Sequence, residues 1–462
     1  MQKRGQIHRA TLIAATAFTG LVGACATQSA SPTGPIVTPG QATLSVTVQE
    51  VPVANLPALH SYVLGEANGK WLVIGGRKDG LHKRRPFEAF LAADNNSTIY
   101  VIDVAAATVW SASLTTLAPS LAEQLQSTNM QSHQRGDQLY IVGGYGYSAT
   151  AGDHVTHGFV TAVNVPATIA AIIANAPVAP HIRQLADERL AVTGGYLGEL
   201  DGTFYLAGGQ RFMGRYNPMG PSHGPGFVQE YTNEIRRFQI VDDGTTLAIA
   251  DYAAWHDDAN LHRRDYNMVP QVFPDGSRGF TMFSGVFQYD QNVPWLNTVD
   301  IRASGHQVVP VFQQLLSQYH SAHVPLYDAT RNEMHTLFFG GMAQYFYDGT
   351  GVLRQDNNVP FVRTISMVTR GADGSMKESA IGEMPALLGA SAEFIANPAA
   401  PTLPNGVLTL GTVPADGIDL GYILGGIQSN APNVFFSDAA NASIASAKLF
   451  RVTLKQTTAA AK

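Results

Sequence analysis

A short apolar run that ends in a glycine pair recurs along this 462-residue chain. Its copies are WLVIGG (71–76), LYIVGG (139–144), FYLAGG (204–209), FTMFSG (280–285), TLFFGG (336–341) and YILGGI (422–427). In the fourth copy Ser284 stands in place of the first glycine. Short apolar runs bounded by turn residues are typical of β-strands. Their recurrence predicts an architecture built from similar structural units.

Each of these runs lies among other strand signals. A turn signal precedes it, as at Asn68-Gly69, Asp201-Gly202 and Asp275-Gly276, which predicts a β-hairpin. A third strand is expected after each glycine pair, over 99–104, 159–165, 235–241, 296–301, 361–368 and 447–454. Tight turns such as 242–244, 304–305 and 373–374 then lead towards a fourth strand. The sequence therefore predicts an all-β, six-bladed β-propeller with four-stranded antiparallel blades.

The two ends of the chain are expected to complete one blade. The last unit ends at its third strand, and residues 44–51 (LSVTVQEV) form a suitable fourth strand. Pairing of this N-terminal strand with the last blade would close the propeller and remove exposed sheet edges. Residues 117–126 and 167–174 favour short helices, so units one and two are expected to lack a regular fourth strand.

The repeated strands with glycine pairs, followed in the first unit by Asp103 and Trp110, resemble Kelch repeats over residues 43–455. The resemblance implies Kelch-like architecture and does not extend to one functional family. Galactose oxidase shares that architecture, but its copper site needs a cysteine joined to a tyrosine. Because the one cysteine of this chain is Cys25, near the N-terminus, that activity is disfavoured and no cofactor is predicted.

The N-terminus resembles a bacterial lipoprotein signal. Lys3 and Arg4 precede an apolar stretch over 10–21, and Val22-Gly23-Ala24-Cys25 is similar to a lipobox. We expect a signal peptide over 1–24, a lipidated Cys25 with a flexible tether over 25–41, and a single propeller domain over 42–462. Residue 26 is alanine, and the lipoprotein resemblance then implies outer-membrane sorting, facing the periplasm or the cell exterior. An ordinary signal peptide with a chance cysteine is the alternative.

The net charge and the spacing of the histidines limit which ligands and partners the protein is expected to bind. The net charge is −6 and the sequence pI is about 6.1. Nucleic-acid binders usually carry a basic patch, so no nucleic-acid partner is expected. His154 with His157, and His256 with the two aspartates after it, lack a third ligand at metal-binding spacing, so no metal site is predicted. The membrane, reached through Cys25, is the partner that the sequence indicates.

Connection lengths place function at one end of the blades. The turns between first and second strands, and between third and fourth strands, are mostly tight. The segments after the glycine pairs are long: 77–98, 145–158, 210–234, 286–295, 342–360 and 428–446. In an antiparallel blade these segments all emerge at the same end. Long loops in a compact domain are usually functional, so the ligand site is predicted there.

The long segments and the links beside them are rich in guanidinium, amide and aromatic groups. Such groups suit polyhydroxylated or anionic ligands, because they give directional and bidentate hydrogen bonds. The candidate ligand-binding residues are Arg77, Arg84, Arg85, Tyr145, Gln210, Arg264, Gln288, Gln344 and Gln428. Aromatic residues that could add flat surface for a sugar ring include Tyr147, Phe212, Tyr216, Phe287, Tyr289, Trp295, Tyr345 and Tyr347. The alternative is that these side chains only pair blades or satisfy backbone groups.

The sequence is compatible with three functions. The first is a tethered binding protein for a glycan or another anionic small molecule. The second is a carbohydrate-active enzyme, such as a lyase or epimerase acting on uronate-like sugars, for which His82, Tyr145, His262 and Tyr266 are the catalytic candidates. The third is a protein–protein interaction propeller without a small ligand. The sequence contains no specific catalytic motif, so it does not decide whether the protein is an enzyme.

Overall fold

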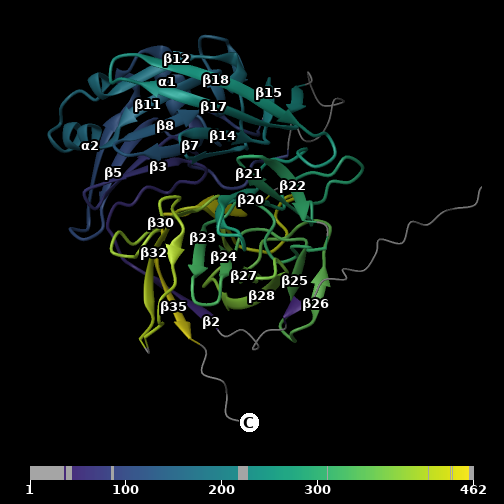
Figure 1. Ribbon diagram of the computed structural model, residues 1–462. Coiled ribbons are helices and arrows are strands. Elements are labelled where there is room, and N and C mark those ends of the chain that lie inside the picture. The colour runs from purple at the N-terminus through teal and green to yellow at the C-terminus, as the bar shows by residue number, and fades with distance from the viewer. Residues whose placement is uncertain are drawn as a thin grey trace, which may run out of the picture. The chain divides into compact units, whose positions relative to one another are not determined.

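The computed structural model describes residues 36–37, 44–84, 88–216, 227–309, 311–414, 416–437, 439 and 441–456. These residues form an all-β, propeller-like fold made mainly of four-stranded antiparallel sheets (Figure 1). The predicted signal peptide, Cys25 and Arg85 lie outside the described residues. No helix within the described ranges is long and apolar enough to cross a membrane.

The first three sheets follow one another along the chain. The first contains β3 (Val63–Ala67), β4 (Lys70–Ile74), β5 (Thr98–Asp103) and β6 (Thr108–Ser113). The second contains β7 (Gln131–Arg135), β8 (Gln138–Val142), β11 (Phe159–Asn164) and β12 (Ile182–Ala186). The third contains β13 (Tyr196–Leu200), β14 (Thr203–Ala207), β17 (Glu234–Asp242) and β18 (Leu247–His256). Within each sheet the strands lie side by side in chain order.

The next three sheets repeat the pattern with additions. The fourth contains β19 (Asn267–Val272), β20 (Arg278–Phe283), β21 (Thr298–Arg302) and β22 (Gly305–Val309). The fifth contains β23 (His323–Asp328), β24 (Glu333–Phe339), β27 (Thr364–Arg370) and β28 (Met376–Glu383), with the short strands β1 (Ile36–Val37) and β31 (Leu408–Thr409) parallel at its edges. The sixth contains β30 (Glu393–Ala396), β32 (Ile418–Leu424), β35 (Leu449–Gln456) and β2 (Leu44–Glu50).

Two expectations about the fourth strands have different outcomes. The pairing of the N-terminal strand with the last sheet is present, because β2 pairs antiparallel with β35 from Leu44↔Gln456 to Glu50↔Phe450. The short helices are confirmed as α1 (Pro119–Leu125) and α2 (Val165–Ile173). The expectation that units one and two lack a fourth strand is wrong, because β6 ends before α1 and β12 begins after α2. Each helix is therefore added to its unit and replaces no strand.

The glycine pairs join each sheet to the next one. The second glycine donates its N–H to a carbonyl in the segment that leads into the following sheet. The bonds are Gly76 to Ser127 (2.9 Å), Gly144 to Val192 (2.9 Å), Gly209 to Arg263 (2.7 Å), Gly285 to Gln318 (3.3 Å), Gly341 to Leu388 (3.4 Å) and Gly426 to Leu59 (2.9 Å). A Cβ on the first glycine would collide with the same carbonyl, at 1.9 Å from Val192 O for Gly143. Glycine permits this close backbone approach because it has no Cβ.

A second set of backbone hydrogen bonds runs in a cycle through all six sheets. We call it the hydrogen-bonded ring; its members lie two or three residues before β3, β7, β13, β19, β23 and β30. Its bonds are Asn129 N to Ser61 O (3.2 Å), Gly194 N to Asn129 O (3.2 Å), Asp265 N to Gly194 O (2.8 Å), His320 N to Asp265 O (2.9 Å), Ser391 N to His320 O (2.9 Å) and Ser61 N to Ser391 O (3.2 Å). The sixth bond returns to the first residue, so the segments that lead into the first strands form a closed cycle of hydrogen bonds.

Apolar clusters lie between consecutive sheets. One cluster between the second and third sheets contains Val142, Phe204 and Phe238. Another combines Trp71 and Val73 of the first sheet with Ile395, Leu424 and Leu449 of the sixth. Burial of large apolar side chains on both faces of each sheet is the main stabilising contribution, at about 1.5–3 kcal/mol for each fully buried side chain. The sheets therefore stabilise one another face to face.

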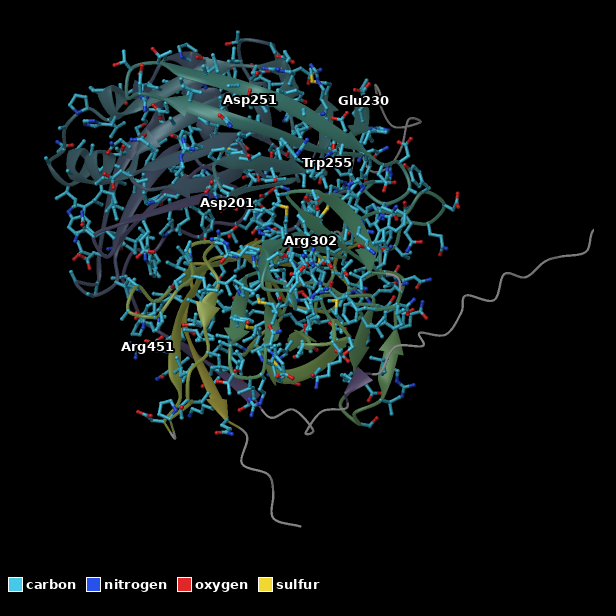
Figure 2. The ribbon with its side chains drawn as sticks, viewed as in Figure 1. Asp201, Glu230, Asp251, Trp255, Arg302 and Arg451 are labelled. Carbon is cyan, nitrogen blue, oxygen red and sulfur yellow. The ribbon has the colours of Figure 1, made fainter. Side chains whose placement is uncertain are left out.

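The two ends of the sheets differ as the connection lengths predicted. Most connections at one end, the turn end, are tight, and Asp201 there accepts a hydrogen bond from Arg278 of the next sheet (2.8 Å; Asp201 is labelled in Figure 2). Two turn-end connections are long: residues 165–181, which contain α2, and residues 397–417, which contain β31.

At the other end, the loop end, the long segments carry short strands. These are β9 (Tyr145–Ser148), β10 (Asp153–Thr156), β15 (Gln210–Met213), β16 (Val228–Tyr231), β25 (Tyr345–Tyr347), β26 (Leu353–Gln355), β29 (Leu388–Ala390), β33 (Ile427–Ser429) and β34 (Ser443–Ala445). The remaining short elements are the 3₁₀ turns η1 (Ala92–Asp94), η2 (Leu114–Thr116), η3 (Ala179–His181) and η4 (Glu188–Leu190).

Candidate functional site

The loop end presents two kinds of segment around the axis. One kind follows each glycine pair, and the other links each sheet to the next. Isolated β-bridges join them at His60↔Arg77, Thr128↔Tyr145, Thr193↔Gln210 and Arg264↔Val286. The residue after a glycine pair is therefore held beside the residue that precedes the hydrogen-bonded ring. This pairing places each residue that follows a glycine pair beside the link that leads into a sheet, so sequence-distant segments meet next to the hydrogen-bonded ring.

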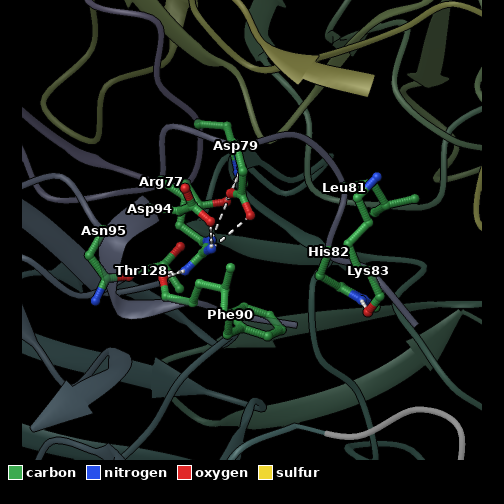
Figure 3. A network of polar contacts seen from close by, with 12 residues as sticks. Arg77, Asp79, Leu81, His82, Lys83, Phe90, Asp94, Asn95 and Thr128 are labelled. Atoms are coloured by element: carbon green, nitrogen blue, oxygen red, sulfur yellow. Dashed lines mark hydrogen bonds and ion pairs between the residues drawn. The ribbon is translucent and has the colours of Figure 1, made fainter. Parts of the chain in front are cut away.

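Arg77 is buried and all of its described hydrogen bonds are made within the protein (Figure 3). Its Nε and Nη2 donate to the two carboxylate oxygens of Asp79 at 2.8 and 2.7 Å, and Nη1 donates to Asn95 Oδ1 at 3.0 Å. Burial alone would raise the pKa of Asp79, but His60 and Arg77 lower it well below its usual range. The guanidinium therefore links residues within the 77–98 segment to one another. This arrangement agrees with the alternative that the side chain has a structural role.

Arg264 lies in the loop-end segment that leads into β19, directly before Asp265 of the hydrogen-bonded ring. Its side chain is 14% exposed, its Nε donates to Tyr231 Oη at 3.1 Å, and Nη1 donates to Asp265. Its guanidinium also lies over the Phe287 ring, 5.2 Å from the centroid. Burial would lower the pKa of Arg264, but Tyr231 and Asp265, with two further tyrosines, raise it. The guanidinium is therefore charged at all physiological pH values.

Three more aromatic side chains surround this arginine. Tyr216 and Tyr319 lie within electrostatic range of Arg264, and so does His82. We call the set the loop-end cluster; its members are His82, Tyr216, Tyr231, Arg264, Phe287 and Tyr319. His82 packs edge-on against Tyr216 at 4.9 Å between ring centroids. Burial, together with the nearby arginines, lowers the pKa of His82 to about 4, although the Lys83 carbonyl and Asp79 oppose the shift. This imidazole is therefore neutral at pH 7.

Arg84 lies beside the cluster on apolar rings. Its guanidinium is 4.7 Å from the Phe435 centroid and 4.2 Å from the Phe436 centroid. His82 contacts the same Phe435 ring at 5.3 Å. The buried Nε of Arg84 has no hydrogen-bond partner among the described residues. Among the described residues, the contacts of Arg84 are with aromatic rings, so its Nε is a donor that these residues do not use.

Two of the catalytic candidates are tyrosines committed to backbone carbonyls. Tyr145 Oη donates to Gly214 O at 2.8 Å and accepts from Tyr216 N at 3.1 Å. Tyr266 Oη donates to Ala207 O at 2.5 Å. Burial raises the pKa of both phenols well above the usual value for tyrosine. This arrangement joins neighbouring segments and is poorly suited to proton abstraction from a substrate.

The third candidate, His262, is stacked between two tyrosines. Its ring lies 3.8 Å from the Tyr231 centroid and 3.9 Å from the Tyr289 centroid, at interplanar angles of 20° and 25°. Nδ1 lies 3.0 Å from Asn233 Oδ1. Burial is the main cause that lowers the pKa of His262, with Arg264 contributing. The stack packs against a ring face of Tyr231, whose hydroxyl accepts from Arg264 Nε.

The glutamine candidates do not converge on the cluster through recorded contacts. Gln210 Oε1 accepts from Gln229 at 2.5 Å, and Gln288 Nε2 donates to the Pro294 carbonyl at 2.7 Å. Gln344 Nε2 donates to Asn357 Oδ1 at 2.8 Å, while Gln428 lies on β33, half-buried. Arg85 lies outside the described residues. The structure thus brings together Arg84, Arg264 and His82, with Arg77 and Tyr145 behind them as supports.

Sequence reasoning missed Tyr231, Tyr319 and the acidic partners Asp79 and Asp265. Tyr319 and Asp265 occupy the segments just before β23 and β19, where the chain enters the hydrogen-bonded ring. The repeat itself contains a usable signal, because positions shortly before each predicted first strand must face the axis. Among the described residues, no group of three or more histidine, cysteine, aspartate or glutamate side chains is arranged to hold a metal.

Comparison with known proteins adds little to the description above. No protein-family model matches the chain, and no curated protein matches its sequence. The solved structures that match include one titled "Structure of YjhT", with 12% sequence identity and a TM-score of 0.46. That match covers 86% of this chain and 99% of the other. The functional proposal therefore depends on the side chains described above.

Proposed function

We propose that the chain is an envelope lipoprotein, anchored through Cys25, whose folded part is a six-bladed Kelch-like β-propeller that binds a small anionic, polyhydroxylated ligand. Two features support six blades and closure: the hydrogen-bonded ring visits six sheets, and Gly426 of the last sheet donates to Leu59, which leads into the first. The apolar cluster shared by the sixth and first sheets supports the same arrangement. The anchor proposal depends on the lipobox-like sequence alone.

The observation that carries the ligand proposal is the position of Arg264. A charged guanidinium near the axis, 14% exposed and flanked by Tyr216, Tyr231 and Tyr319, provides one cation and several phenol groups. Arginine recognises carboxylates in bidentate fashion, and aromatic rings pack against the apolar faces of sugars. Arg84 supplies a second cation whose Nε is unpaired. A uronate-type sugar has both a carboxylate and hydroxyl groups for this surface.

A titration of the full chain with uronate oligosaccharides tests this proposal, with neutral oligosaccharides of the same length for comparison. Hydrogen bonds to charged groups contribute about 1.5–3 kcal/mol, so Arg264→Gln is expected to weaken uronate binding about tenfold or more. Arg302→Gln is the control, because Arg302 lies at the turn end and pairs there with Asp275 (2.8 Å; Figure 2). Equal uronate affinity in Arg264→Gln and the unmodified chain would contradict the placement of the ligand.

A protein partner is the second candidate, because apolar side chains are exposed in the loop-end segments. Seven large apolar residues there are more than a third exposed: Leu91, Val228, Tyr289, Val311, Val352, Phe436 and Ile444. Exposed apolar surface of this kind is typical of interaction sites. Phe436 is 67% exposed and also contacts Arg84. Phe436→Ser should weaken capture of a protein partner while leaving a sugar-binding site at Arg264 intact.

A further inference from the structure

A cavity of about 200 Å³ lies on the axis, next to the hydrogen-bonded ring. Its lining comes from the beginnings of the first strands and the ring residues before them: Ser61, Tyr62, Val63, Leu64, Asn129, Met130, Gln131, Ser132, Gly194, Gly195, Tyr196, Leu197, Asp265, Tyr266, His320, Glu393 and Phe394. The acidic groups in this lining are Asp265 and Glu393, and the described lining residues include no lysine or arginine. A polar space of this size has room for several water molecules or a small organic cation.

The two carboxylates differ in their partners. Asp265 accepts from Arg264 and, through Oδ1, from Asn129 Nδ2 at 3.1 Å. No hydrogen bond from the described residues reaches the carboxyl group of Glu393. Its ion-pair contact among those residues is with His320 Nε2, 3.4 Å from Oε1. Glu393 therefore lies in the cavity with acceptor capacity that the protein does not use.

The histidines beside Glu393 do not supply a compensating charge. Burial, together with the nearby His323, lowers the pKa of His320 to about 3. The pKa of His323 is also lowered by burial, and its Nε2 lies 3.2 Å from Tyr196 Oη. Tyr62 and Tyr196 face the same carboxyl group, and burial raises the pKa of both phenols. At neutral pH the two histidines and two tyrosines around Glu393 are therefore uncharged.

The cavity also offers acceptors beyond Glu393. Gln131 is 3% exposed, and its Oε1 has no hydrogen-bond partner among the described residues. Five of the six carbonyls of the hydrogen-bonded ring accept one described bond and have a second lone pair, whereas Asn129 O also accepts from Gln131 and Thr193. An environment with acceptors, a carboxylate and no cationic side chain favours a ligand that brings both positive charge and N–H donors. A divalent metal is disfavoured, because three or more charged or imidazole ligands do not meet in the described residues.

We propose that the axial cavity binds a small ammonium-type cation, ammonium itself or a primary amine, through the carboxylate of Glu393. The ligand would donate to Glu393 and to neighbouring acceptors, and its charge would replace the missing counter-ion. Because burial raises the pKa of Glu393 to about 8, binding must displace a proton from this carboxyl group. This site is independent of the loop-end cluster, which is cationic.

Calorimetric titration of the full chain with methylammonium chloride tests the proposal. Affinity is expected to rise about tenfold for each pH unit up to pH 8 and then level off, because Glu393 must be deprotonated. At pH 7, the binding heat in buffers of different ionisation enthalpy should reveal release of close to one proton. Potassium chloride is the comparison, because potassium carries the charge without N–H donors.

Glu393→Gln is expected to abolish methylammonium binding at pH 9. Glu383→Gln is the matched control, because Glu383 is 68% exposed and pairs with Arg363 outside the cavity. The pH profile of the unmodified chain decides the question even if Glu393→Gln does not fold. Absent methylammonium binding at pH 9, a pH-independent affinity, or potassium binding of equal strength would each overturn the proposal.

Discussion

The loop-end cluster and the axial cavity meet at the hydrogen-bonded ring, yet one contains a cation and the other contains acidic groups. The cluster contains Arg264 with phenol groups around it, whereas the described lining of the cavity contains Asp265 and Glu393 and no lysine or arginine. Asp265 lines the cavity and accepts a hydrogen bond from Arg264 of the cluster. The same backbone ring therefore separates a surface suited to anions from a chamber suited to cations. Two adjacent residues, 264 and 265, mark the change.

The difference also shows what makes a buried charged group available to a ligand. Arg77 and Arg264 are both largely buried, but Arg77 donates from all three guanidinium nitrogens to Asp79 and Asn95, whereas the described hydrogen bonds of Arg264 use Nε and Nη1 and leave Nη2 for a ligand. Among acids, Glu378 accepts N–H groups from Leu315 and Leu316, while Glu393 accepts none from the described residues. A charged group that the protein already satisfies has a structural role. One that is left unsatisfied, in a space large enough for a ligand, is a candidate for binding.

The largest effect is expected from breaking the contact that holds neighbouring sheets together. Gly143→Ala would place a Cβ 1.9 Å from Val192 O at a backbone φ of +66°, so either the glycine or the next sheet must move. We expect a loss of about 4 kcal/mol in unfolding free energy, measured by urea denaturation. Gly136→Ala is the control, because it has φ of +58° but open space around it, and should cost about 1 kcal/mol. Equal losses would mean that close approach at the glycine pair is unimportant.

The sequence predicted this architecture well, because the repeat depends on a local requirement. The glycine pair must allow a neighbouring carbonyl to approach, so it recurs in units whose other residues differ. Ser284 departs from the repeat and still adopts φ of +56°, while its hydroxyl donates to Trp295 O at 2.6 Å. The expectation that two units lack a fourth strand was wrong for a physical reason. The helix-favouring segments form α1 and α2 in addition to β6 and β12. These two strands are held by backbone hydrogen bonds, which sequence patterns constrain only weakly.

The candidate site was harder to predict, because it depends on which hydrogen-bond donors are already used in bonds within the protein. Arg77, Arg84 and Arg264 have the same chemistry in the sequence, and only the fold gives Arg77 its partner Asp79 and Arg264 its partner Tyr231. Glu393 gave no signal either, since a single glutamate at the start of a strand usually faces solvent. The axial position of such residues follows from the hydrogen-bonded ring, which depends on contacts between all six sheets.

Glu378 is a buried acid whose carboxyl group already accepts hydrogen bonds from the protein, so we expect it to affect stability and not ligand binding. Burial raises its pKa to about 7, although the N–H groups of Leu315 and Leu316 oppose the shift. The unfolded chain loses this proton near pH 4.5, so stability falls as the pH rises from 4.5 to 7 and stays low above that. Glu378→Gln removes this titration, so its stability relative to the unmodified chain should increase by about 3 kcal/mol across that window, measured by urea denaturation.

The same variant separates Glu378 from Glu393. Methylammonium binding should be unchanged in Glu378→Gln, because Glu378 lies outside the lining of the axial cavity. A variant that kept the pH-dependent loss of stability would show that another group causes it. A variant that lost methylammonium binding while remaining folded would remove the distinction between the two acids.

Arg77 tests the corresponding distinction among the cations. Arg77→Met would leave Asp79 and Asn95 without their guanidinium partner, and we expect a loss of about 2 kcal/mol in unfolding free energy. The loss is moderate because the Asp79 side chain is 27% exposed and regains some hydration. Arg189→Met is the control, since the pair with Asp187 is at the surface and should contribute less than about 1 kcal/mol. A larger loss of unfolding free energy in Arg189→Met than in Arg77→Met would contradict the structural role of Arg77.

The smallest effect is expected at Tyr231, which supports Arg264 without contributing charge. Its hydroxyl accepts from Arg264 Nε at 3.1 Å and from Phe287 N at 3.3 Å, so Tyr231→Phe should cost about 1 kcal/mol in unfolding free energy. It should also weaken uronate binding severalfold, because the guanidinium loses the group that orients it. Tyr289→Phe is the matched control: Tyr289 stacks on the other face of His262, but its hydroxyl donates to Asp258 O, away from Arg264. If both variants weakened uronate binding equally, the stack around His262, and not the hydrogen bond to Arg264, would define the ligand site.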